Sequence, residues 1–142
     1  MELQIKNIIA ELELQQLDTI PGVKTLQPWA TWIFYRGKTE EIRSYPNKKL
    51  VLTAILASGW DNYFNKKETI AELPYPYEHF CIIGFVRLVG ITHYQDAHTF
   101  NSNYESHFNP PNFFDGECFG WQLEDITPIR PIYYEHGVLP LF

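Results

Sequence analysis

Residues 79–94, HFCIIGFVRLVGITHY, carry the strongest strand signal in the chain. Apolar, β-branched and aromatic side chains dominate this stretch, as they do in β-strands. Gly84 and Gly90 interrupt it at positions where a strand can bulge or bend, and closed barrels need such bends to turn their corners. The stretch therefore predicts a long, bent strand in a curved sheet.

Other segments on both sides of this stretch also have strand character. They are 23–27 (VKTLQ), 39–45 (TEEIRSY), 48–58 (KKLVLTAILAS), a strand pair in 118–134 (CFGWQLEDITPIRPIYY) broken at Pro128 and Pro131, and a last short strand in 137–142 (GVLPLF). Several short strands with few helices favour an α+β domain containing a small β-barrel of about five to six strands.

Three helices are expected to flank the barrel. Residues 1–17 are amphipathic, 28–36 begin at a proline and end before Gly37, and 60–73 (WDNYFNKKETIAEL) precede the breaker PYPY. We expect residues 1–22 to form a helix and turn packed on the domain, and 23–142 to form the barrel. Residues 95–116 lack a clean period and are expected to be a long functional or mobile loop.

Composition narrows the possible partners. The 142 residues fit one domain, and a formal net charge of −6 excludes the diffuse basic field of non-specific duplex binders. The first residues show neither a secretory signal nor a membrane span, so we expect a cytoplasmic protein, a monomer or weak dimer, with both cysteines reduced. The histidines of 93–107 do not have metal-ligand spacing, and no metal or cofactor is predicted.

The segment 38–45 gathers charges in a pattern with two interpretations. Strand alternation places Glu41 and Arg43 side by side on one face, with Lys38 just before them. They can form an ion pair that only holds the fold together. Alternatively, Lys38 and Arg43 contact an anion while Glu41 accepts a hydrogen bond from a base or sugar hydroxyl.

Four landmarks, in this order, resemble the ASCH family, which is related to the PUA domains of RNA-binding and RNA-modifying proteins. They are QPWATWI (27–33) opening a helix, GKTEEIRS (37–44) with the pattern G-K-x-x-E-x-R, CIIGFVRLVGI (81–91), and FGWQLEDITPIRPI (119–132) followed by a glycine and a final strand. The resemblance covers the chain from about Leu26 to Phe142. It implies a closed or nearly closed barrel with a cleft beside the helix that begins at Trp29.

The resemblance also implies that the cleft meets RNA or a nucleotide-like ligand. The expected ligand-binding residues are Trp29, Lys38, Glu41, Arg43, Ser44, Tyr45 and Trp121. Some ASCH-like proteins are amidohydrolases on acylated nucleosides and others are ribonucleases, so a hydrolase using Lys38 and Glu41 is the alternative. The amidohydrolase motif has a threonine where this chain has Glu41, which argues against deacylation. A protein-interaction module acting through the first helix or the 95–116 segment is a further alternative.

Overall fold

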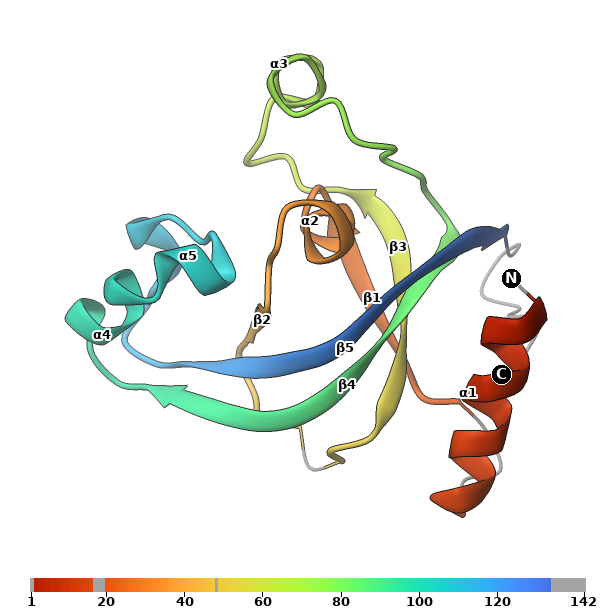
Figure 1. Cartoon of the computed structure of the whole chain (residues 1–142). Coiled ribbons are helices and arrows are strands. Elements are labelled where there is room, and N and C mark those ends of the chain that lie inside the picture. The colour runs from red at the N-terminus through yellow and green to blue at the C-terminus, as the bar shows by residue number, and fades with distance from the viewer. Residues whose placement is uncertain (1, 17–19, 48, 134–142) are drawn as a thin grey trace.

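The computed structural model describes residues 2–16, 20–47 and 49–133. Over these residues, strands β1 (Gly22–Gln27), β2 (Glu40–Arg43), β3 (Leu52–Trp60), β4 (Cys81–Tyr94) and β5 (Cys118–Tyr133) form one five-stranded sheet in the order β1-β3-β4-β5-β2. The β1–β3 pair is parallel, and the other neighbours are antiparallel. Figure 1 shows this sheet curving around helix α2 (Trp29–Tyr35). The predicted α+β class is confirmed.

The prediction of a closed barrel is wrong. β1 and β2 are the two edges of the sheet, and no backbone ladder joins them in the described part of the chain. β2 has only four residues, and its ladder with β5 runs from Glu40 opposite Gln122 to Arg43 opposite Phe119. The gap to β1 is spanned instead by the Arg43 side chain, which contacts Lys24 and Thr25.

Helix α2 covers the concave face of the sheet. Its first turn is held by Gln27, whose buried side-chain oxygen accepts the Thr31 N–H at 2.9 Å. Its end is set by Gly37, whose φ of +81° suits glycine, and the Lys38 N–H then returns to the Trp32 carbonyl. The predicted helix and its stop signal are thus confirmed.

Helix α1 (Glu2–Leu14) lies against the opposite face of the sheet (Figure 1). Its Ile8 and Leu12 are buried in a cluster with Leu52 and Phe85 of β3 and β4. Burial of such side chains contributes roughly 1.5–3 kcal/mol each, so the helix is held by its own domain.

The glycines of β4 mark irregularities, as predicted. Register shifts occur between Ile82 and Gly84 and between Leu88 and Gly90. Because of the first shift, Ile82 and Phe85 share the α1 face although they are three positions apart. A side chain at Gly84 would overlap the Phe34 ring, so this glycine also lets α2 approach the sheet closely.

The helix predicted at 60–73 is shorter than expected. Helix α3 covers Lys66–Glu72, while Trp60 ends β3. Asn65 caps α3 by accepting the Glu68 N–H at 2.9 Å. Asp61 lies in the preceding turn, where its side chain accepts the Tyr63 N–H. These local hydrogen bonds compete with the helix over residues 61–65.

The 95–116 segment is more regular than predicted. It contains α4 (Ala97–Ser102), α5 (Tyr104–His107) and the 3₁₀ helix η1 (Pro111–Phe113). Asp96 caps α4, and Phe100 packs with Tyr94 and Cys118 in a small separate cluster. Short helices with side-chain caps and no long apolar period are difficult to recognise in a sequence.

The predicted strand pair at 118–134 is instead one long strand, β5. Pro128 and Pro131 do not interrupt it because they lie beyond the part of β5 that pairs with β2. There β5 is hydrogen-bonded to β4 alone, so its outer side tolerates residues without an N–H. The last strand predicted at 137–142 lies outside the described residues.

The described helices are too short to cross a lipid bilayer. The longest of them, α1, has 13 residues, whereas a spanning helix needs about 20.

Candidate functional site

A pocket of about 500 Å³ lies where the two edge strands approach each other. β1 and β2 supply two of its walls, α2 supplies Trp29, and the segment 109–118 closes another side. The residues that line it are Lys24, Thr25, Leu26, Trp29, Glu41, Ile42, Arg43, Ser44, Asp61, Asn109, Phe113, Asp115, Glu117 and Cys118. Its volume is in the range of small-molecule sites.

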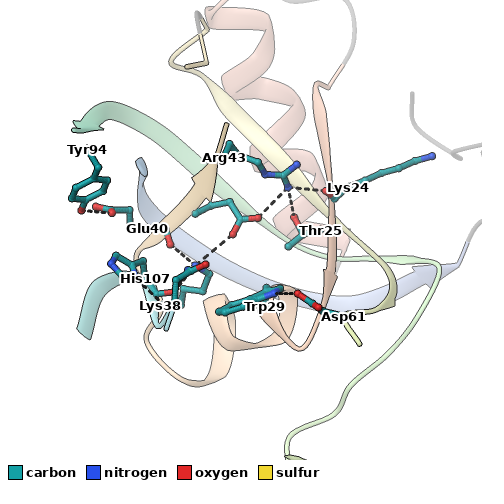
Figure 2. A network of polar contacts seen from close by, with 11 residues as sticks. Lys24, Thr25, Trp29, Lys38, Glu40, Arg43, Asp61, Tyr94 and His107 are labelled. Atoms are coloured by element: carbon teal, nitrogen blue, oxygen red, sulfur yellow. Dashed lines mark hydrogen bonds and ion pairs between the residues drawn. The ribbon is translucent and has the colours of Figure 1, made fainter. Parts of the chain in front are cut away.

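Arg43 joins the edge strands and forms part of the pocket wall. Its Nη2 donates to the Lys24 carbonyl at 2.7 Å, to the Thr25 hydroxyl at 3.2 Å and to a Glu41 carboxylate oxygen at 3.0 Å (Figure 2). The guanidinium carbon also lies 5.5 Å from the centre of the Trp121 ring. Strand alternation explains why Glu41 and Arg43 meet, since they are two residues apart on β2.

Glu41 lies between two cations. One carboxylate oxygen is 3.4 Å from Lys38 Nζ, and the other is 3.0 Å from Arg43 Nη2. Its side chain is 10% exposed and borders the pocket. Both carboxylate oxygens already have protein partners, so a ligand would share them.

Lys38 lies behind Glu41 and is fully buried. Its ammonium donates to the Glu40 carbonyl at 2.5 Å and to the His107 carbonyl at 2.9 Å, besides its contact with Glu41 (Figure 2). Burial lowers the pKa of Lys38, and the charge of Glu41 opposes part of that decrease. All three N–H groups therefore point at protein oxygens, and the side chain is not part of the pocket wall.

Trp29 provides the aromatic wall predicted for the cleft. Its indole N–H donates to an Asp61 carboxylate oxygen at 2.8 Å, and Lys38 Nζ lies 5.3 Å from the ring centre. Phe64 and Phe113 pack edge-to-face against the ring. The indole is only 7% exposed, so it offers the ligand an edge of the ring more than an open face.

The other predicted wall residues divide between two places. Ser44 lines the pocket, whereas Tyr45 and Trp121 line a neighbouring cavity of about 370 Å³. Trp121 is 3% exposed and donates its indole N–H to the Tyr45 carbonyl at 2.9 Å. The structure thus brings Lys38, Glu41 and Arg43 together, but Trp29 and Trp121 line different cavities.

The pocket has an acidic side that no sequence pattern predicted. Asp61, Asp115 and Glu117 line it together with Glu41, while its lining cations are Lys24 and Arg43. A carboxylate-rich lining disfavours a polyanion inside the pocket. For Asp115 the lack of periodicity in the 95–116 segment was the available signal, because long irregular segments in compact domains are often functional.

A second polar layer supports β2 from behind. Glu40 is buried, and its carboxylate accepts from the Tyr94 hydroxyl and the Gln122 amide, each at 2.5 Å. His107 donates to the Phe100 carbonyl through Nε2 and accepts the Asn109 N–H at Nδ1, so its ring is neutral here. Burial lowers the pKa of His107. These groups hold Lys38 and Asn109 in position.

No group of three or more His, Cys, Asp or Glu side chains within residues 2–16, 20–47 and 49–133 is arranged to hold a metal ion. His93 is 2.7 Å from Glu117 at the surface, His98 is exposed on α4, and His107 is buried.

Neither a protein-family model nor a curated protein matches this sequence. Solved structures do match. The ASCH protein of Zymomonas mobilis superposes with a TM-score of 0.55 at 20% sequence identity, covering 79% of this chain and 71% of its own. Two mutant forms of that protein give TM-scores of 0.54 and 0.53 at 23% and 22% identity, again over 79% of this chain and over 72% and 73% of theirs. The ASCH resemblance is therefore confirmed at the level of the fold, and this chain has an ASCH-like fold.

Proposed function

We propose that the protein binds a nucleobase-containing ligand, either a nucleoside or an unpaired nucleotide of single-stranded RNA, in the pocket between β1 and β2. The observation that supports this most directly is the lining of the pocket. It combines the edge of the Trp29 indole with carboxylates, the amide of Asn109 and the guanidinium of Arg43. Base edges present donors and acceptors side by side, and such a mixed lining can satisfy both.

The charge of the lining favours the base over the phosphate as the occupant. Within the described part of the chain, four carboxylates and two cations border the pocket, so a phosphate placed there would meet repulsion. A nucleobase is uncharged and has exocyclic amino groups that donate to carboxylates. Glu41 and Asp61 are the acceptors expected to read such a donor.

The position of Lys38 favours binding over hydrolysis by a lysine nucleophile. A nucleophilic amine must aim its lone pair at the substrate. Lys38 instead directs its N–H groups to Glu40, Glu41 and His107, and it does not reach the pocket wall. We assign Lys38 the role of positioning Glu41.

The interaction-module alternative has less support from the first helix. The apolar side chains Ile8 and Leu12 of α1 are already buried on the sheet of the same chain. An adaptor helix would need an apolar face free for its partner.

The experiment is a calorimetric titration of the wild-type protein with the four common ribonucleosides and with short single-stranded RNAs. We expect at least one of them to bind, and Glu41→Gln to weaken that binding at least severalfold by removing a charged acceptor. Glu72→Gln is the matched control, because Glu72 is exposed on α3 and lines neither cavity. If no nucleoside or RNA binds the wild type, the proposal fails.

A further inference from the structure

We infer that the neighbouring cavity is an anion subsite that takes the phosphate group of the same ligand. This inference rests on the proposed function, because it places the base in the pocket beside Trp29. The cavity is about 370 Å³ in volume and is lined in part by Arg43, Tyr45, Asn47, Lys49 and Trp121. The ligand class would then be a nucleotide or an RNA phosphate step, rather than a free nucleoside.

The two cavities differ in the charge of the residues that line them. Among the residues that the structure describes, the lining of the neighbouring cavity includes Lys24, Arg43 and Lys49 and no acidic residue. The base pocket, in contrast, is bordered by four carboxylates. In Figure 2 the Lys24 side chain extends away from Arg43, so Arg43 and Lys49 are the cations on which the subsite depends. An anion crossing from one cavity to the other loses repulsion and gains attraction.

Arg43 has N–H donors that are free to bind a ligand. A guanidinium has five N–H donors. The three hydrogen bonds of Arg43 within the described residues all use Nη2, and Nε and Nη1 have no hydrogen-bond partner there. The side chain is 22% exposed, so a ligand can reach it. Arginine presents pairs of donors that match two oxygens of a phosphate.

The two cavities share part of their walls. Arg43 and Lys24 line both cavities, so the two cavities adjoin at these residues. A nucleotide that places its base beside Trp29 would need its phosphate only one sugar away, across Arg43. Tyr45 is 55% exposed at the rim and packs edge-to-face on Trp121, which gives the subsite a firm wall.

The indole N–H signals of the tryptophans can report ligand binding in each cavity separately. The chain has four tryptophans, and each gives one indole N–H signal in a ¹H–¹⁵N spectrum. The Trp29 indole bonds to Asp61 at the base pocket, and the Trp121 indole bonds to the Tyr45 carbonyl at the anion subsite. Single Trp→Phe variants assign the signals.

The experiment titrates the full chain with orthophosphate, with ribonucleosides and with the matching nucleoside monophosphates. We expect orthophosphate to shift the Trp121 signal and leave the Trp29 signal in place. A monophosphate should shift both signals and bind more tightly than either the nucleoside or orthophosphate. Lys49→Gln should weaken monophosphate binding about fivefold, the size of one exposed ion pair, and leave nucleoside binding unchanged.

The control is Lys67→Gln, because Lys67 is exposed on α3 and lines neither cavity. The inference is overturned if orthophosphate leaves Trp121 unmoved or if the monophosphate binds no better than orthophosphate. A nucleoside that still shifts Trp29 in that case leaves the proposed function standing. If instead no nucleoside shifts Trp29 while orthophosphate shifts Trp121, the proposed function fails and the anion site itself remains.

Discussion

The Nη2 atom of Arg43 on β2 lies 2.7 Å from the carbonyl oxygen of Lys24 on β1. These residues belong to the two edges of the sheet, so one side chain spans the gap at which a barrel would close with a backbone ladder. The same side chain borders both cavities. Fold and candidate site therefore depend on a single guanidinium.

Arg43→Ala should lower the free energy of unfolding by about 1–3 kcal/mol. The change removes the hydrogen bonds to Lys24 and Thr25 and leaves Glu41 with one cation fewer. Chemical denaturation would measure the loss. Arg130→Ala is the control, since Arg130 is exposed on β5. Equal stability of the two variants would show that Arg43 does not hold the edge strands together.

Lys38→Met should lower the free energy of unfolding by about 3–5 kcal/mol, more than Arg43→Ala does. A loss of this size is expected when one partner of a buried ion pair is removed. Methionine fills a similar volume, but the Glu40 and His107 carbonyls and the Glu41 carboxylate lose their shared donor. Thermal and urea denaturation would measure it, with exposed Lys67→Met for comparison. A stability change below about 1 kcal/mol would contradict a structural role for this ammonium.

Gly84→Ala should destabilise the protein by about 1–3 kcal/mol, because it overfills a packed interface. A Cβ at Gly84 would overlap the Phe34 ring of α2 and lie 2.6 Å from the Thr127 carbonyl oxygen. Gly90→Ala tests the same strand at a position where the nearest atom is 3.8 Å away, and it should be tolerated. Denaturation midpoints of both variants check this, and similar losses at both positions would refute the packing argument.

Both cysteines are buried and free, and burial raises the pKa of Cys81 to about 12 and that of Cys118 to about 11. From about pH 9 upward, the thiols of the unfolded chain lose protons that the folded chain retains. Stability should therefore fall with rising pH, by at most about 1.4 kcal/mol per pH unit for each thiol.

Cys81→Ala should flatten this fall between pH 9 and about 12, and Cys118→Ala should flatten it between pH 9 and about 11. Urea denaturation at a series of pH values would measure both slopes. At pH 8, thiol reagents should react slowly with the folded protein, because both groups are protonated. Rapid labelling, or slopes identical to that of the wild type, would contradict the assigned burial.

The sequence predicted the elements whose signals are local and periodic. Gly84 and Gly90 marked the irregularities of β4, and alternation along β2 predicted that Glu41 and Arg43 would lie together. The break predicted at Pro128 and Pro131 does not occur. A proline interrupts a strand only where a neighbouring strand needs its N–H for a hydrogen bond on that side. The short helices of 95–116 were missed because helices of three to six residues carry little periodic signal.

By itself, the sequence determined the α+β class, the bends in the longest sheet segments and the set of charges at 38–43, because backbone preference and side-chain periodicity act over a few residues. Only the tertiary structure decided that Lys38 is enclosed while Glu41 and Arg43 reach a cavity, and that carboxylates line one of the two cavities at Arg43 while Lys49 lines the other. Burial and electrostatic surroundings arise from residues far apart in the chain, here β1, β2 and the segment 109–118, which come together only when the sheet curves.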